Sequence, residues 1–152
     1  MTGGLRHKVL AVLLGVHAWS AVPARAEEAL GPFALTDFAA RLVEVYNAGN
    51  VSGLHAVLAP ALQASYPPEK LREALTRCRV LTRDILRLST PSWGARTYGF
   101  FAAYAEPGVF EMILEIDPQA RIVYLLITDD IDAKAQQCRL SDRAQDGMTR
   151  SP

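Results

Sequence analysis

The segment 37–49 reads DFAARLVEVYNAG and carries apolar residues at helical spacing. The residues that would form its apolar face are Phe38, Leu42, Val45 and Tyr46. We therefore expect a helix here, capped at its start by Thr36 or Asp37. Gly49 is suited to end this helix because glycine takes a positive φ at little steric cost, and Asn50 is suited to cap the next one.

Two more helices and a short turn are expected before Arg83. The segment VSGLHAVLA (51–59) predicts a second helix, and PALQAS (60–65) predicts a short turn that begins at Pro60. The segment PEKLREALTRCRVL (68–81) predicts a third helix, because Pro68 is well placed in a first helical turn. Its expected buried positions are Leu71, Ala74, Leu75 and Cys78, and its charged residues form the solvated face.

From Arg83 onward the hydrophobic period changes from 3.6 residues to 2, which is typical of strands. Four strands are expected, in RDILRLST (83–90), ARTYGFFAAYA (95–105), VFEMILEID (109–117) and RIVYLLIT (121–128). The turns EPG (106–108) and DPQA (117–120) are short, so neighbouring strands should be antiparallel. In the third strand, Phe110, Met112, Leu114 and Ile116 share one face.

This order of elements predicts an α+β domain, with about three N-terminal helices packed on one face of a strongly bent, antiparallel, four-stranded sheet. We place the domain at residues 27–131. Residues 132–152 are polar and aperiodic, so we expect a loosely ordered tail that is tethered by Cys138.

The first 26 of the 152 residues have the features of a cleaved secretory signal peptide. A basic start precedes the apolar run VLAVLLGV (9–16), and Ala24 and Ala26 supply an A-x-A cleavage pattern. The alternative is a membrane anchor, but a span needs about 20 apolar residues and this run is shorter. We therefore expect an exported protein, periplasmic or secreted, with no stable membrane insertion after cleavage.

The charge balance and the two cysteines indicate which partners and which cellular compartment to expect. The expected signal peptide contains three of the 16 basic residues, Arg6, Lys8 and Arg25, and none of the 16 acidic residues. The mature chain is therefore slightly acidic. This balance argues against nucleic acid as a partner. In an exported chain Cys78 and Cys138 are most simply a disulfide, which would close a loop of about 60 residues and contribute about 4 kcal/mol.

The stretch YNAGNVSGLHAVLAPAL, together with the order of elements, resembles the nuclear-transport-factor-2-like, or cystatin-like, superfamily. YPPEKLREAL, GVFEMILEID and RIVYLLIT are similar to segments of uncharacterised exported bacterial domains of this fold. The resemblance covers roughly residues 33–128 and implies a cone-shaped domain. Such a cone holds a small apolar ligand or is filled by its own side chains.

The resemblance also permits a comparison with the ketosteroid isomerases of this superfamily, which use a Tyr and a carboxylate near the helix junction. Aligning the junctions places Leu42 at the Tyr position and Tyr66 at the carboxylate position. Leu donates no hydrogen bond, and a Tyr with a pKa near 10 is a poor base at neutral pH. A dehydratase would need a His facing a carboxylate, and His55 is the single His after the leader. We interpret His55 as a helix-surface or half-buried residue, with catalysis as the alternative.

The sequence also lacks the motifs of serine hydrolases and of calcium sites. The chain lacks G-x-S-x-G and S-x-x-K motifs, and Asp129, Asp130 and Asp132 lack the loop pattern of a calcium site. We therefore expect no metal, no cofactor and no catalytic residue.

A candidate ligand pocket is formed by four tyrosines and a glutamate, provided that their strand faces line the cone. These residues are Tyr46, Tyr66, Tyr98, Tyr104 and Glu111. A desolvated Glu111 would have a raised pKa. The alternative is that Glu111 and Glu115 lie on the exposed face of the sheet.

Three functions follow from these features. The leading hypothesis is a non-catalytic, exported accessory domain that binds a small apolar ligand or a protein partner in the cell envelope. The second is a small isomerase or dehydratase that uses Glu111 with Tyr hydroxyls. The third is a module that forms homodimers through the outer face of its sheet.

Overall fold

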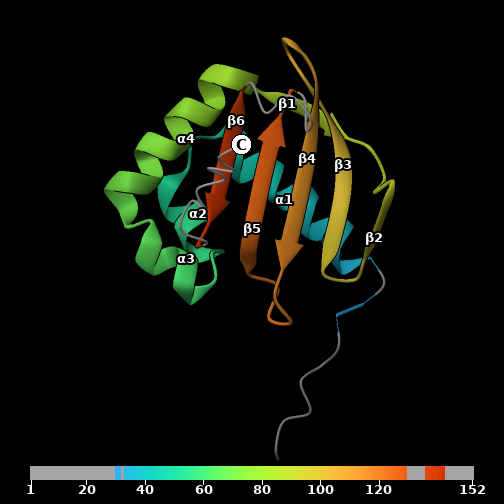
Figure 1. Ribbon diagram of the computed structural model, residues 1–152, viewed down its shortest axis with the longest axis horizontal. Helices are drawn as coiled ribbons and strands as arrows, with labels where there is room; N and C mark the ends of the chain where they lie inside the picture. The colour runs from blue at the N-terminus through green and yellow to red at the C-terminus, as the bar shows by residue number, and fades with distance from the viewer. Residues whose placement is uncertain (1–29, 32, 130–135, 143–152) are drawn as a thin grey trace, which may run out of the picture.

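A computed structural model describes residues 30, 31, 33–129 and 136–142 (Figure 1). The expected signal peptide and most of the expected tail lie outside these residues. The described helices are α1 (Ala34–Asn47), α2 (Val51–Ala56), α3 (Pro60–Ser65) and α4 (Pro68–Thr82). The described strands are β1 (Ile85–Leu88), β2 (Trp93–Ala95), β3 (Tyr98–Ala105), β4 (Gly108–Ile116), β5 (Ile122–Thr128) and β6 (Gln137–Ser141). The predicted α+β class is confirmed, but the described residues contain four helices rather than about three and six strands rather than four.

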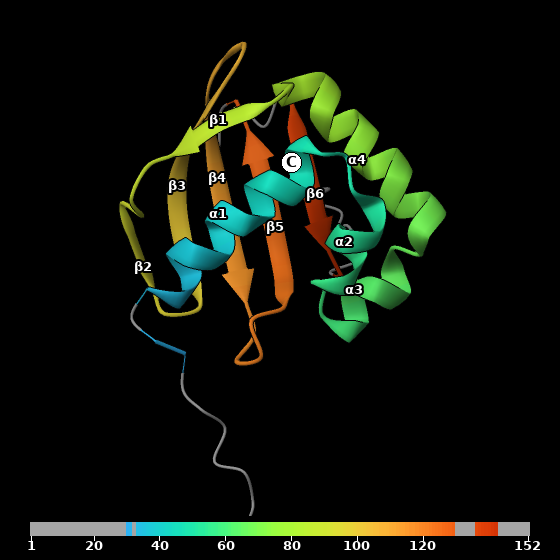
Figure 2. The same cartoon turned by 180° about the vertical axis from the view of Figure 1, so that it is seen from behind.

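The six strands form one open, antiparallel sheet in the order β1-β3-β4-β5-β6, with β2 also paired to β3. Helix α1 crosses one face of this sheet, and α2, α3 and α4 gather beside the β6 edge (Figure 2). No described helix covers the opposite face, which is turned to the viewer in Figure 1. We call this opposite face the outer face.

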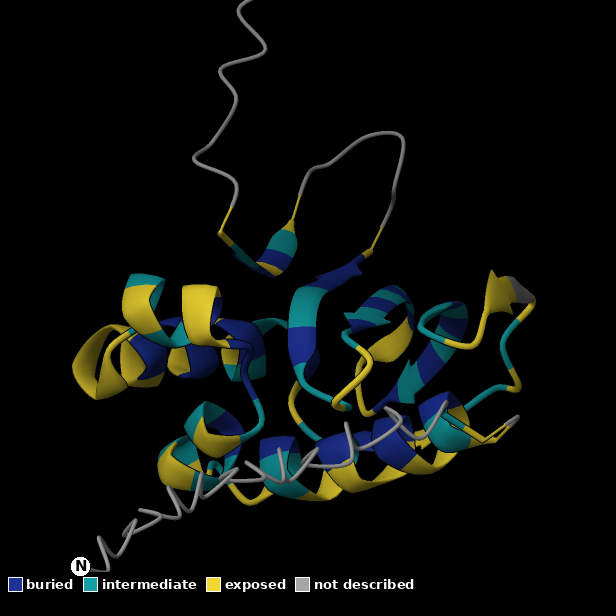
Figure 3. Ribbon diagram, turned by 90° about the horizontal axis from the view of Figure 1, so that it is seen from below, coloured by how far each residue is buried: buried dark blue, intermediate teal, exposed yellow. Residues whose placement is uncertain are grey.

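Strict alternation along the central strands creates the core. In β4 the four residues predicted to share a face are all buried, and in β3 the buried residues also alternate with half-buried ones. The buried side chains of the sheet meet the apolar stripe of α1, which is dark blue on its sheet side in Figure 3. Phe101, Met112 and Leu114 are each at most 1% exposed, so side chains fill the space between α1 and the sheet.

Strand β6 lies in the segment that the sequence pattern assigns to a loosely ordered tail. It pairs with β5 in the register Leu125↔Leu140 and Ile127↔Cys138. Cys138 and Leu140 are buried, and the predicted disulfide between Cys78 and Cys138 joins β6 to α4. Two buried side chains and one covalent bond therefore order a strand whose other residues are polar. This strand also makes β5 internal to the sheet.

The junction between α1 and α2 is built as the sequence predicts. Gly49 has φ +60°, and the amides of Gly49 and Asn50 donate to the carbonyls of Tyr46 and Val45. These two hydrogen bonds form a Schellman motif that satisfies the last carbonyls of α1. The Asn50 side chain then accepts a hydrogen bond from the Gly53 amide at 2.9 Å and caps α2.

Two helix boundaries differ from expectation. Helix α1 begins at Ala34, three residues before Asp37, and no side chain caps it. The earlier start buries Leu35 in the core, so packing rather than capping places this end. Helix α2 ends at Ala56 because Leu58 leaves it to form a parallel bridge with Ile122 of β5.

Asn47, the last residue of α1, fastens this helix to the first strand. Its side-chain Nδ2 donates to the Ile85 carbonyl at 2.8 Å, and the Ile85 amide donates to Asn47 Oδ1 at 2.9 Å. The Asn47 side chain thus pairs with both the amide and the carbonyl of Ile85, which is 38 positions away in the sequence. These two hydrogen bonds fix where β1 starts relative to α1.

Candidate functional site

The five residues expected to line one pocket lie in three different places. Tyr98, Tyr104 and Glu111 are half-buried on the outer face of the sheet. Tyr98 stands opposite Glu115, and Tyr104 is diagonal to Glu111 across the β3–β4 pair. The structure therefore brings these three onto one face, and it separates them from Tyr46 and Tyr66.

Tyr46 is buried within the core, and its hydroxyl lies 2.7 Å from the Thr82 hydroxyl. Burial raises the pKa of the Tyr46 hydroxyl, and the hydrogen bond with Thr82 and the charge of Arg79 partly oppose this shift. Because Thr82 also bonds to the Arg83 carbonyl at 2.9 Å, the two hydroxyls join α1 to the end of α4. This arrangement explains Tyr46 as a structural contact.

Tyr66 lies at the end of α3, where the Lys70 ammonium stands 4.9 Å from the centre of its ring. It borders a groove between α4 and β6, beside the disulfide. Leu42, which occupies the position of the isomerase Tyr in the resemblance, is buried in the core.

On the outer face, Tyr98 has a raised pKa, caused first by desolvation and then by Tyr124 and Glu115. Glu115 and Tyr124 are cross-strand neighbours, so Tyr98, Glu115 and Tyr124 form one row across three strands. This row lies on the face that no described helix covers.

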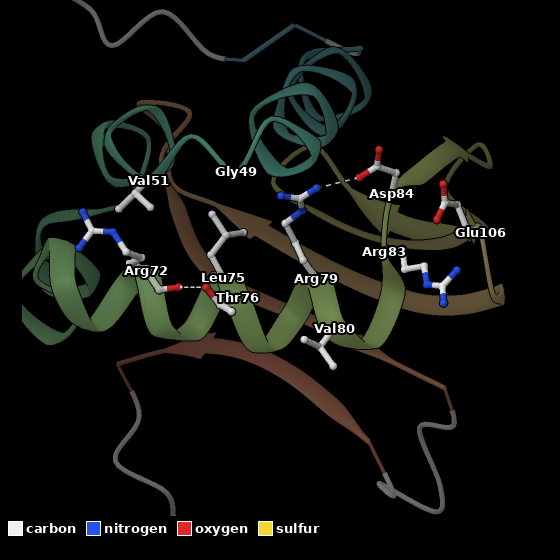
Figure 4. Close-up of a pocket in the computed structure, with 10 residues that line it drawn as sticks. All are labelled: Gly49, Val51, Arg72, Leu75, Thr76, Arg79, Val80, Arg83, Asp84 and Glu106. Atoms are coloured by element: carbon white, nitrogen blue, oxygen red, sulfur yellow. Dashed lines mark hydrogen bonds and ion pairs between the residues drawn. The ribbon is translucent and has the colours of Figure 1, made fainter.

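A cleft of about 530 Å³ opens on the other side of the molecule, beside the second half of α4 (Figure 4). Its walls come from α4, from the α1–α2 junction, and from the start of β1 with the β3–β4 turn. Its lining residues are Gly49, Val51, Arg72, Leu75, Thr76, Arg79, Val80, Arg83, Asp84 and Glu106. We call it the arginine cleft, because three of these side chains are guanidinium groups on one stripe of α4 and the residue that follows it.

Arg79 occupies the middle of the arginine cleft. Its Nη2 donates to Asp84 Oδ1 at 3.0 Å, whereas its Nε is buried and has no acceptor among the described residues. A buried donor without a partner costs roughly 1–3 kcal/mol. A Cβ atom on Gly49 would lie 3.0 Å from Arg79 Nη1, so the glycine of the junction also leaves room for this guanidinium.

Arg83 carries a second cost in the same cleft. It follows α4 with φ +51° and ψ −136°, a combination that non-glycine residues rarely adopt and that costs about 1–3 kcal/mol. Unusual backbone geometry of this kind gathers at functional sites. An unsatisfied donor and a strained backbone thus occur four residues apart, and both side chains line one cleft.

A second cleft of about 490 Å³ adjoins the first and shares Gly49, Val51 and Arg72 with it. His55 and Ser52 line this second cleft. The Ser52 hydroxyl donates to Asn50 Oδ1 at 3.0 Å, and in the described part of the chain no hydrogen bond joins Ser52 to His55. The cleft therefore shows no activated nucleophile.

Metal-binding clusters and membrane spans are both missing from the residues that the structure describes. Across 30, 31, 33–129 and 136–142, no group of three or more His, Cys, Asp or Glu side chains is placed to hold a metal ion. None of the helices in these ranges has the length and apolar character needed to cross a membrane.

One signal for the arginine cleft is present in the sequence, within the charged helix face that the pattern predicts to be solvated. Arg72, Arg79 and Arg83 follow one another at intervals of seven and four residues, so they lie on one stripe of a helix. Only the neighbouring junction and strand convert this stripe into a cleft.

Comparisons with known proteins add no assignment. No protein-family model, no curated protein and no solved structure matches this chain.

Proposed function

We propose that this chain is a non-catalytic, exported accessory domain of the cell envelope, and that it binds an anionic group of a ligand or partner in the arginine cleft. The filled core supports a surface site over one between α1 and the sheet. The disulfide between Cys78 and Cys138 is consistent with an oxidising location outside the cytoplasm.

The observation that carries the proposal is that two energetically unfavourable features occur in one cleft. The unsatisfied Nε of Arg79 and the strained backbone of Arg83 each lower the stability of the empty protein. The half-exposed ion pair between Arg79 and Asp84 contributes only about 0–1 kcal/mol, so it does not offset the two unfavourable features. Binding gives a reason to keep arginine at these positions, because a guanidinium is the side chain best suited to hold a carboxylate or a phosphate through paired hydrogen bonds.

The other charged residues and the volume of the arginine cleft limit which ligands it can bind. Asp84 already pairs with Arg79, and Glu106 adds a second carboxylate at the rim (Figure 4). A ligand with one or two anionic groups and a neutral or cationic remainder is therefore better matched than a polyanion. A volume of about 530 Å³ lies within the usual range for sites that hold small molecules or one peptide side chain.

Arg79→Met tests the proposal because it should separate binding from stability. The purified protein would be titrated calorimetrically with citrate, glycerol phosphate and an acetylated Glu dipeptide as probes. We expect at least one probe to bind, and we expect Arg79→Met to weaken its binding by tenfold or more. The free energy of unfolding should stay unchanged or rise by up to about 3 kcal/mol, because the variant loses only a half-exposed ion pair and removes an unsatisfied donor.

Arg41→Met is the matched control, since Arg41 is an exposed residue of α1 that lies outside the arginine cleft. Equal binding by both variants would refute the assignment of the cleft. A large loss of stability in Arg79→Met without a change in binding would show that Arg79 is a structural residue.

We also propose that the domain is a divergent member of the nuclear-transport-factor-2-like superfamily with a cone-shaped outline. The Gly49–Asn50 junction and the succession of helices before an antiparallel meander support this relationship. An experimental structure that superimposes on members of the superfamily over both layers would test it.

A further inference from the structure

Among the described strands β6 is the last of the sheet, and its outward edge faces a groove. In the described chain β6 pairs only with β5, so its other side has no strand partner. Alternate residues of an edge strand direct their amides and carbonyls away from the sheet, where another strand can pair with them. The groove beside this edge has a volume of about 670 Å³.

Helix α4 supplies the opposite wall of this groove. Lys70, Ala74, Arg77 and Cys78 line it from α4, at the spacing of one helical stripe. This stripe is different from the one that faces the arginine cleft. The disulfide between Cys78 and Cys138 holds the two walls together, with the two Cα atoms 4.9 Å apart.

The charge of the groove is mainly positive. Lys70 and Arg77 on α4 and Arg139 on β6 line it, opposed by Asp142. None of the three cations forms an ion pair with another described residue: Lys70 donates to the Ser65 carbonyl and Arg139 to the Gln137 side chain. Their charges are therefore available to an acidic partner.

We propose that this groove binds an extended, acidic peptide segment of a partner protein, which adds to β6 as a further strand. The main chain of the peptide would pair with the edge of β6 that faces away from β5. Its acidic side chains would meet Lys70, Arg77 and Arg139, and small side chains would pass over Ala74 and the disulfide. Lys70 and Arg77 are seven residues apart, about 10 Å along the helix axis, which fits acidic residues two to four positions apart on a strand.

The test uses the disulfide-bonded protein and the fluorescently labelled peptide Ac-ETETETE-NH2, measured by fluorescence anisotropy. We expect this peptide to bind and to slow hydrogen exchange at the amides of 137–141. Its counterpart with Lys in place of Glu should not bind. Two further peptides keep the charge and carry an N-methyl group on the central Thr or on the Glu before it. One of the two should bind at least tenfold more weakly, because alternate residues of a paired strand donate the ladder hydrogen bonds.

Lys70→Glu with Arg77→Glu should reduce binding of the acidic peptide by tenfold or more. Arg41→Glu with Arg96→Glu makes the same change of charge at exposed positions outside the groove and should leave binding within twofold. Absence of binding at millimolar peptide, undiminished binding of both N-methylated peptides, or equal losses in the two double variants would each overturn the proposal. Binding only after removal of 143–152 would also overturn it, because the chain itself would then compete for the groove. Arg79→Met should have no effect here, so failure of the arginine cleft and failure of this groove are distinguishable.

Discussion

Loss of the disulfide between Cys78 and Cys138 is the perturbation for which the structure supplies a magnitude. The bond links residues 60 positions apart. In the chain-entropy model, closing a loop of that length removes about 14 cal/mol/K from the unfolded chain, or about 4 kcal/mol at 25 °C. Domains are typically stable by about 5–15 kcal/mol, so this one bond is a large part of the total.

The assay is urea unfolding followed by far-UV circular dichroism, on the oxidised protein, the reduced protein and the variant Cys78→Ala/Cys138→Ala. With a urea dependence of about 1–3 kcal/mol/M, loss of the bond should lower the midpoint by more than about 1 M. The reduced protein keeps both sulfur atoms, so it loses the cross-link without losing buried volume. Alanine is preferred to serine because both positions are buried and a hydroxyl would lack water there.

Hydrogen exchange would show which part of the protein loses stability when the disulfide is reduced. Among the described strands β6 pairs only with β5, and the disulfide joins it to α4, so the amides of 137–141 should lose protection first after reduction. If reduction and the double variant both cost less than about 1 kcal/mol, the entropy argument is refuted, since the unfolded chain must then keep the two segments close without the bond.

Three further changes test the helix junction and the end of α4. Asn47→Ala removes both hydrogen bonds to the Ile85 backbone and should lower the free energy of unfolding by about 2–3 kcal/mol in urea titrations; a loss below about 1 kcal/mol would show that water replaces them. Burial raises the pKa of Tyr46. The stabilisation that comes from burying its neutral hydroxyl is therefore present below about pH 10 and is lost as the pH rises through the raised pKa. Tyr46→Phe should therefore show a flatter fall of stability above about pH 10 than the natural protein, and parallel curves would contradict this reasoning. Arg83→Gly should leave stability unchanged or raise it by up to about 1 kcal/mol, because glycine accepts the backbone angles of this position; a clear thermal destabilisation would mean that the backbone there is not strained.

The features that local pattern determines were predictable. Strict alternation in 109–117 identified the buried face of β4, and the Gly49–Asn50 pair identified the helix junction. Their chemistry acts over two to four residues, so a single sequence displays it. The disulfide was predictable because the chain has only two cysteines.

Features that depend on distant partners were not predictable in the same way. Strand β6 has only Cys138 and Leu140 as buried residues, and its order depends on β5 and α4. The hydrogen bonds of Asn47 and Tyr46 reach residues more than 35 positions away. The expected pocket depended on which side of the sheet the helices cover, and alternation along a strand does not contain that information.

The arginine cleft shows the same limit of local pattern. The stripe of Arg72, Arg79 and Arg83 was visible, but a helix face becomes a cleft only when other elements wall it in. The positive φ of Arg83 had no signal at all, because arginine is not a residue that usually marks such a position.

The single disulfide has a consequence for how the protein matures. The ring that it closes contains β1 to β5, so most of the sheet lies between the two sulfur atoms in the chain. With two cysteines in the whole sequence, one intrachain pairing exists, and oxidation has no wrong bond to form within the molecule. Formation of this bond within the chain therefore requires an oxidant but no exchange of wrongly paired cysteines, and a cysteine left unpaired marks a chain in which β6 is not yet joined to α4.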